Sequence, residues 1–232
     1  QDTKVQLNGD SGVGTSLDWE RTFGDEDNTR FRVDGFWRFA DRHKLRFLWF
    51  NNTSDSSRTL DRDIDWGDVT FPVAAQVGAE FDFDVYEVAY EYAFLRRENW
   101  EVSASVGLHW TTLALALSGT AQVGDEEPVS EERREEGSVD LPLPVFGLRG
   151  LWNVGGAFWI DASAQFFTLS IDEYDGSLTD ARLAALWQPR KWLGIGIGYN
   201  RFAVDVDVDS SNFDGSLDWA YQGPILFLSG TF

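Results

Sequence analysis

The chain repeatedly alternates apolar and polar positions, as expected for β-strands whose two faces meet different surroundings. Over residues 85–95, tyrosine, valine and phenylalanine occupy every second position, and glutamate and alanine occupy the positions between them. Similar segments recur along the whole chain. We expect about ten strands, near residues 13–23, 29–40, 43–58, 79–96, 100–120, 140–153, 157–172, 177–189, 192–208 and 215–232.

The connections between these segments alternate between short and long. The short ones lie near residues 40–43, 96–99, 153–156 and 188–191. Two of the others, 59–78 and 122–139, are long and acidic. Barrels of the bacterial outer membrane have short periplasmic turns and longer external loops. The pattern therefore predicts an all-β fold, a closed antiparallel up-and-down transmembrane β-barrel of about ten strands, with eight or twelve as alternatives.

This barrel is expected to form a single domain over residues 1–232. Residues 1–12 are interpreted as a periplasmic N-terminal segment, and 59–78 and 122–139 as external loops. No run of 18 apolar residues is present, so no transmembrane helix is predicted. Mean hydropathy is −0.30, which a barrel tolerates because only alternate residues face lipid.

Tryptophans cluster around the short turns. An indole combines an apolar body with one N–H group, so it favours the boundary between acyl chains and headgroups. We expect Trp49, Trp110, Trp219 and Tyr221 near the opposite boundary. The alternative is a soluble barrel of the lipocalin type, with tryptophans inside. The residues predicted to lie at the turn-side interface are Trp37, Trp100, Trp152, Trp159, Trp187, Trp192 and Phe232.

Charged residues fall on the strand faces opposite the aromatic ones, so they are predicted to point into the lumen. A barrel of about ten strands is narrow, and opposite charges there would interlock as a plug. A constricted pore is the alternative. The predicted lumen network comprises Asp18, Glu20, Arg32, Asp34, Arg38, Glu87, Glu91, Arg149, Asp161 and Arg182.

Two of the predicted strands break the alternation. In 193–208 and in 215–232 the apolar residues change from one parity to the other, near Asn200-Arg201 and near Gly223-Pro224. A slip of one residue predicts a β-bulge at each place. The alternative is that the strands leave the membrane there, so that the rule no longer applies.

Carboxylates at every second position form three acidic ladders, at 61–65, 80–84 and 205–209. Each ladder places its like charges on one strand face, where they need solvent, a basic neighbour or a cation. A solvated acidic rim is the simpler interpretation, and it would contact lipopolysaccharide phosphates through divalent ions. Calcium or magnesium would suit the candidate metal ligands Asp82, Asp84, Asp205, Asp207 and Asp209.

Little else in the sequence indicates chemistry. There is no cysteine, and a net charge of −20 argues against nucleic-acid binding. Of the two histidines, His43 lies in a short turn. His109 is expected in the lumen, where it is a weak catalytic candidate for a lipid- or peptide-modifying enzyme.

The final strand, 224–232, is apolar and ends on Phe232. Together with the turn asymmetry and the aromatic girdles, this ending resembles bacterial outer-membrane β-barrel proteins. Residues 217–224 are similar to uncharacterised members of that class. The resemblance implies an outer-membrane location in a Gram-negative bacterium after removal of a signal peptide, outer-membrane lipid and lipopolysaccharide as partners, and assembly by machinery that reads the last strand. We expect a non-enzymatic structural or interaction protein with an occluded lumen. A narrow cation-preferring channel for small solutes is the alternative, and a membrane enzyme the second.

Overall fold

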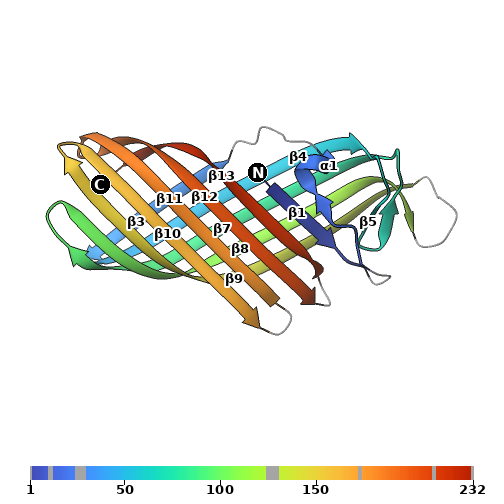
Figure 1. Ribbon diagram of the computed structural model, residues 1–232, viewed down its shortest axis with the longest axis horizontal. Helices are drawn as coiled ribbons and strands as arrows, with labels where there is room; N and C mark the ends of the chain where they lie inside the picture. Colours follow the sequence, from blue (N-terminus) through green and yellow to red (C-terminus); the bar gives the residue numbers. More distant parts are fainter. Residues whose placement is uncertain are drawn as a thin grey trace.

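The computed structural model describes residues 2–9, 13–23, 30–123, 131–171, 174–210 and 213–230, which are almost entirely β-strand (Figure 1). Within these residues no helix is both long and apolar enough to cross a membrane. The one described helix, α1, spans Trp19–Phe23. The strands are β1 (Asp2–Leu7), β2 (Leu17–Asp18), β3 (Phe31–Ala40), β4 (His43–Thr59), β5 (Ile64–Trp66), β6 (Val69–Phe71), β7 (Gln76–Arg96), β8 (Trp100–Val123), β9 (Glu131–Gly155), β10 (Phe158–Ile171), β11 (Tyr174–Arg190), β12 (Leu193–Ser210) and β13 (Phe213–Gly230).

The strands form one antiparallel sheet in the order β2-β1-β13-β12-β11-β10-β9-β8-β7-β4-β3, with β5 and β6 attached beside β8. Neighbours in the sheet are mostly neighbours in the chain, so the chain runs up and down. Figure 1 shows the sheet curled around its long axis. The tight turns lie at one end, on the left, and α1 and β5 lie towards the other end, which we call the loop end.

The sheet is an open half-barrel. On its outer edge β13 pairs with β1 only over Gly215–Ala220, so 222–230 have no strand partner there among the described residues. The outer edge of β3 is also without a strand partner in the described part of the chain. From β3 to β13 the sheet has nine long antiparallel strands, counting both, so β3 and β13 run in the same direction. The all-β, antiparallel, up-and-down arrangement of strands predicted from the sequence is therefore confirmed, whereas the sheet of the described residues is not closed.

The predicted strand boundaries near the N-terminus are wrong in two respects. Asp2–Leu7 forms strand β1, although no strand was predicted before residue 13, and 13–23 contains only the short β2 followed by α1. Asp18 caps this helix, because its Oδ1 accepts a hydrogen bond from the backbone N–H of Arg21 at 3.0 Å. Leu17, Trp19 and Phe23 are buried, since the helix turns its apolar side to the interior.

Along a long strand, alternate side chains stay on the same face of the sheet. The apolar residues, however, lie on the inner face in one half of the strand and on the outer face in the other half. On β7, Val77, Phe81 and Phe83 point inwards and are buried, while Asp82 and Asp84 lie between them on the outer side. Beyond Val85 the same inner face carries glutamate and alanine, and the outer face carries exposed tyrosine, valine and phenylalanine. The loop-end half is therefore apolar inside, and the turn-end half is apolar outside.

The same exchange replaces both predicted β-bulges. β12 and β13 pair in continuous register from Leu193↔Gly230 to Ser210↔Phe213. Asn200, Phe202 and Val204 are all buried on one face. The parity of the apolar residues changes because they move from the outer wall to the interior, and the backbone does not slip. The alternative that these strands pass out of an apolar environment fits this geometry.

An aromatic core fills the loop-end half. Trp219 is fully buried, with its ring centroid 4.4 Å from that of Phe83 and 5.4 Å from that of Phe202. Phe50 stacks on Tyr221 at 5.7 Å, so β4 and β13 meet across the interior. Trp219 and Tyr221 were expected at an outer boundary. That expectation is wrong, because both lie in the loop-end half, where the apolar side chains point into the interior.

Candidate functional site

A layer of charged side chains fills the interior of the turn-end half. Eight of the ten residues predicted for the lumen network lie in this layer, and the structure brings them together through ion pairs and hydrogen bonds. They come from strands spread around the curled sheet, because each strand contributes its inward phase. They are Arg32, Asp34, Arg38, Glu87, Glu91, Arg149, Asp161 and Arg182.

The half of the layer nearer the loop end is a chain of alternating cations and carboxylates. Arg32 on β3 donates to Asp34 at 3.0 Å and to Asp180 on β11 at 3.1 Å. Arg182, also on β11, contacts Asp34 at 3.5 Å and Asp161 on β10 at 3.3 Å. Arg149 on β9 completes the chain through Asp161. These contacts bring the free edge strand β3 against strands on the far side of the interior.

Hydrogen bonds extend this chain towards the aromatic core. The Asn200 side-chain amide donates to Asp180 Oδ1 at 2.6 Å, and the Tyr221 hydroxyl donates to Asn200 Oδ1 at 2.8 Å. Arg30 lies over the Tyr221 ring at 5.0 Å. The charged layer and the core are therefore joined through β11, β12 and β13.

The half of the layer nearer the tight turns is built around two glutamates. Lys44 Nζ contacts Glu91 at 2.5 Å and also pairs with Glu101. Arg38 donates to Glu101 at 2.8 Å, and Arg46 lies 3.6 Å from Glu91. Lys44, Glu91 and Glu101 are all buried, so each charge depends on its partners for stabilisation.

The space between the two halves is nearly filled. Gln165 donates to Glu87 at 2.7 Å, and His109 Nε2 lies 3.0 Å from the other oxygen of Glu87. A cavity of about 20 Å³ remains between Arg32, Glu87, Gln165 and Arg182. A cavity of this size holds about one water molecule.

Two predicted network residues lie elsewhere. Asp18 caps α1 and pairs with Arg21 at 3.2 Å. Glu20 belongs to α1, and its side chain is outside the described set. Both were assigned to the lumen because a strand was expected where the helix forms.

Several members of the layer were missed by the sequence argument. Asp180 and Asn200 are buried in the chain that starts at Arg32. The inward phase of β11 already pointed to Asp180 through Arg182, two residues away. Asn200 was missed because a bulge was expected there. The other missed members are Lys44, Arg46, Glu101 and Gln165.

Each histidine lies within hydrogen-bonding distance of one polar side chain. His109 is fully buried between the charged layer and the apolar core, and Thr111, beside it on the inner face, is also buried. His43 lies at the tight-turn end, with Nδ1 at 2.6 Å from the Tyr90 hydroxyl. The buried His109 ring lies against the Glu87 carboxylate, and in this structure a substrate has no access to it.

The acidic ladders lie mainly on the outer wall of the loop-end half. Asp205 is directly opposite Asp218 on β13, and Asp207 is directly opposite Asp175 on β11. Burial, together with the charges of Asp207 and Asp218, raises the pKa of Asp205. Glu80 on β7 accepts hydrogen bonds at both carboxylate oxygens from Arg134 on β9, at 2.6 and 2.7 Å, and that hydrogen bonding lowers the pKa of Glu80.

No metal centre is formed by these ladders in the part of the chain that the structure describes. Within it, no three His, Cys, Asp or Glu side chains are grouped to hold an ion. Asp82 and Asp84 lie on β7, whereas Asp205 and Asp207 lie on β12, which is not a neighbour of β7 in the sheet. The side chain of Asp209 is outside the description.

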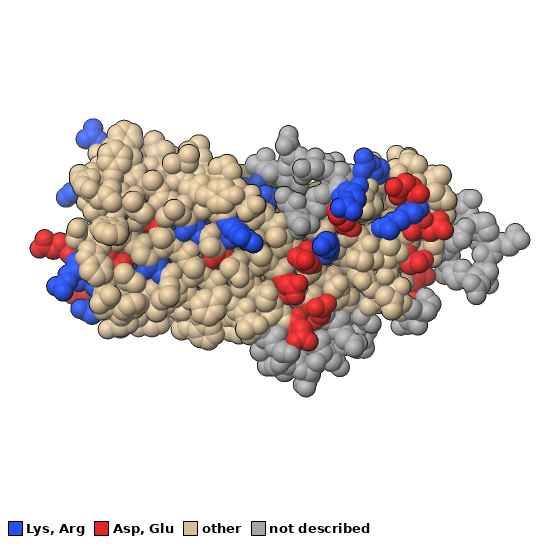
Figure 2. Space-filling view, in the orientation of Figure 1, with Lys and Arg blue, Asp and Glu red and all other residues tan. Residues whose placement is uncertain are grey.

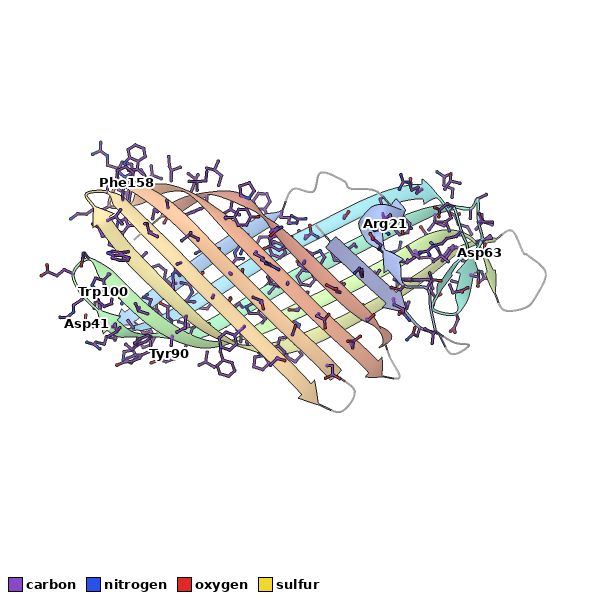
Figure 3. All side chains as sticks on the ribbon, viewed as in Figure 1. Arg21, Asp41, Asp63, Tyr90, Trp100 and Phe158 are labelled. Carbon is purple, nitrogen blue, oxygen red and sulfur yellow. The ribbon has the colours of Figure 1, made fainter. Side chains whose placement is uncertain are left out.

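Aromatic side chains surround the tight-turn end. Trp37, Trp152, Trp187 and Trp192 are exposed on the outer wall, and Trp100, which is half-buried, pairs with Trp152 across the β8–β9 ladder. Figure 3 shows Trp100 and Phe158 at this end, and Arg21 and Asp63 at the opposite end.

The remaining residues predicted for membrane boundaries differ in their surroundings. Trp159 is half-buried, with Phe158 and Ile160 on the outer side of its strand. Trp49 and Trp110 are exposed at the level where the faces exchange. Phe232 lies outside the described residues.

Comparison with known proteins adds no assignment. No protein-family model matches the chain, and no curated protein is similar to it.

Replacing Lys44 with methionine is expected to destabilise the protein by about 3–5 kcal/mol, because Glu91 and Glu101 would then be buried without their shared cation. Urea unfolding followed by tryptophan fluorescence measures this change. The control Arg62→Met removes an exposed charge and should shift stability by no more than about 0.5 kcal/mol. Equal effects of the two substitutions would contradict the argument.

Replacing Asp205 with asparagine is expected to stabilise the folded protein at pH 7. The pKa of Asp205 is raised on folding, so the folded state holds this proton more tightly than the unfolded state, and stability falls as pH rises through the folded pKa. The gain from Asp205→Asn should therefore disappear in acid, where the carboxyl is protonated in both states. Unfolding curves of the two proteins at pH 3 and pH 7 test this, and a gain that is equal at both values would refute it.

Proposed function

We propose that this protein is an outer-membrane β-barrel of a Gram-negative bacterium, with a filled interior and a structural or interaction role. One observation supports this proposal above all. Along continuous strands, the apolar side chains pass from the inner face in the loop-end half to the outer face in the turn-end half. In the turn-end half, exposed apolar side chains face outwards from every long strand, while charges are sheltered inside. A soluble barrel would place its apolar residues inside along the whole strand length.

The exposed apolar belt is close to the height of a bilayer's hydrocarbon region on β7 and shorter on β12. On β7 it runs from Tyr86 to Phe94, nine residues, and on β12 from Leu193 to Tyr199, seven residues. A tilted strand crosses the hydrocarbon region with about 9–11 residues. Aromatic side chains border the belt on the turn side, and Trp49, Tyr86 and Trp110 border it on the loop side. This arrangement supports a periplasmic location for the tight turns.

The proposal requires that the two free sheet edges be satisfied within the membrane. Unpaired N–H and C=O groups cost several kcal/mol each in hydrocarbon, and those of β3 and of 222–230 lie at the level of the belt. Arg32 and Arg182 already hold β3 towards β11. Closure of the barrel is therefore part of the proposed function.

The filled interior favours a non-conducting protein over the narrow channel. The loop-end half is occupied by the aromatic core, and the charged layer encloses a cavity of only about 20 Å³. Near the tight turns, the ring of Phe227 lies where a side chain on Gly196 would be. No observation favours the enzyme alternative, since His109 is inaccessible.

The outer acidic wall is proposed to face the cell exterior. Its carboxylates would meet lipopolysaccharide phosphates through divalent ions, because direct contact between like charges is repulsive. The last strand is proposed to be read by the barrel-assembly machinery.

A positive charge placed in the belt should block membrane insertion. Val106→Arg, on the outer face of β8 within the belt, is expected to cost about 2–4 kcal/mol of folding stability in lipid. Ala114→Arg is the matched control on the same strand and face, beyond the belt and opposite Asp82, and should cost about 0–1 kcal/mol. The folded fraction in phospholipid vesicles, read from the heat-dependent shift in gel mobility, measures both. Equal behaviour of the two variants, or a wild-type protein that folds without any amphiphile, would overturn the proposal.

Purified wild-type protein in planar bilayers is expected to give no discrete conductance steps, because the lumen is packed at both levels. Cation-selective steps would show that the sealed interior is wrong and would favour the channel. Insertion is verified in the same membranes by protection from added protease.

A further inference from the structure

We propose that the tight-turn end is a docking surface for the headgroups of anionic phospholipids, an inference that rests on the proposed membrane location. Basic side chains gather at this end, with few acidic ones, in a chain whose net charge is −20 (Figure 2). The surface is defined by Arg42, Arg97, Arg190 and Lys191, which are all exposed.

The turns that carry these residues form one continuous rim. The backbone N–H of Ala93 on β7 donates to Arg42 O at 2.8 Å, and the Arg96 side chain donates to Asp41 O at 2.6 Å, which joins the first turn to the end of β7 that leads into the second. Asn153 N–H donates to Asn99 O at 2.7 Å, and Gln188 N–H donates to Ala157 O at 2.8 Å. Four turns that are far apart in sequence are therefore held side by side, so their charges act on one surface.

The cations of the rim are not consumed by internal pairing. In the described part of the chain, Arg97, Arg190 and Lys191 form no ion pair, and Arg42 donates only to the backbone oxygen of Phe94, at 3.3 Å. The acidic groups at this end are Asp41 and Glu98, and Asp41 is already contacted by Arg96 at 3.5 Å. The rim therefore carries a net positive charge opposite in sign to the protein as a whole.

The neighbouring tryptophans select a membrane surface over an acidic protein as the partner. Trp37, Trp152, Trp187 and Trp192 are exposed beside the same turns. Indole rings settle between acyl chains and headgroups, which places the adjacent Arg and Lys side chains at phosphate level in the same leaflet. Each basic residue near an anionic lipid surface adds binding energy that salt weakens.

The test compares two lipids that differ only in headgroup. Full-length protein is folded into vesicles that mix phosphatidylcholine with phosphatidylglycerol, and quenching of tryptophan fluorescence by brominated forms of each lipid gives their relative affinity. The variant is Arg97→Gln/Arg190→Gln/Lys191→Gln. The control Lys4→Gln/Arg62→Gln/Arg201→Gln removes the same number and kinds of charge from exposed positions away from the tight turns.

Wild-type protein and the control are expected to prefer phosphatidylglycerol about fivefold or more at low salt, and the rim variant to lose this preference. Added salt should abolish it. An equal loss in the control, or a preference retained by the rim variant, overturns the docking surface. If wild-type protein enters vesicles but prefers neither lipid, the lipid-docking proposal is also overturned, and an acidic protein becomes the better candidate for the partner of the rim. Failure to enter vesicles at all refutes the proposed function itself.

Discussion

The curled shape of the sheet depends on two reciprocal ion pairs between β3 and β11. Among the described residues, β3 is hydrogen-bonded to a strand on one edge only, so its backbone does not by itself hold the sheet curved. Arg32 reaches Asp180, and Arg182 reaches Asp34, across the interior. Removing one member would leave a buried ion without its counter-ion, which is costlier than never having buried the pair. The charged layer thus determines which strands face one another.

This constraint explains why the interior has two chemistries. Ions need counter-ions and hydrogen bonds when they leave water, and the turn-end half supplies them from several strands. The loop-end half instead packs Trp219 against Phe83 and Phe202. Asn200 and Tyr221 join the two regions. The Asn200 amide donates to Asp180, and the Tyr221 hydroxyl donates to Asn200, while the Tyr221 ring stacks on Phe50 in the aromatic core.

Simple alternation was enough to predict the architecture and most of the charged layer. Where a strand is amphipathic along its length, as around Glu87 and Glu91, parity alone gives the inner face. It failed at Trp219 and Asn200 because apolar residues were assumed to face outwards everywhere, although they move inside beyond the belt. It failed at Trp19 because Leu17, Trp19 and Phe23 satisfy a strand pattern and the face of a short helix almost equally well. The partners of Arg32 could not be derived, since contacts across a curved sheet depend on its curvature.

The continuous register of β12 and β13 has a mechanical consequence. The same hydrogen-bonded ladder runs from the half with an apolar outer wall to the half with an acidic outer wall. The pairing of β12 with β13 is therefore uninterrupted at the level where the outer surface changes. In the proposed bilayer, a displacement along the strand by two residues would carry Asp84 into the hydrocarbon or Tyr86 out of it. If the proposed membrane location holds, the depth of immersion would be set by side-chain chemistry on every long strand of the sheet.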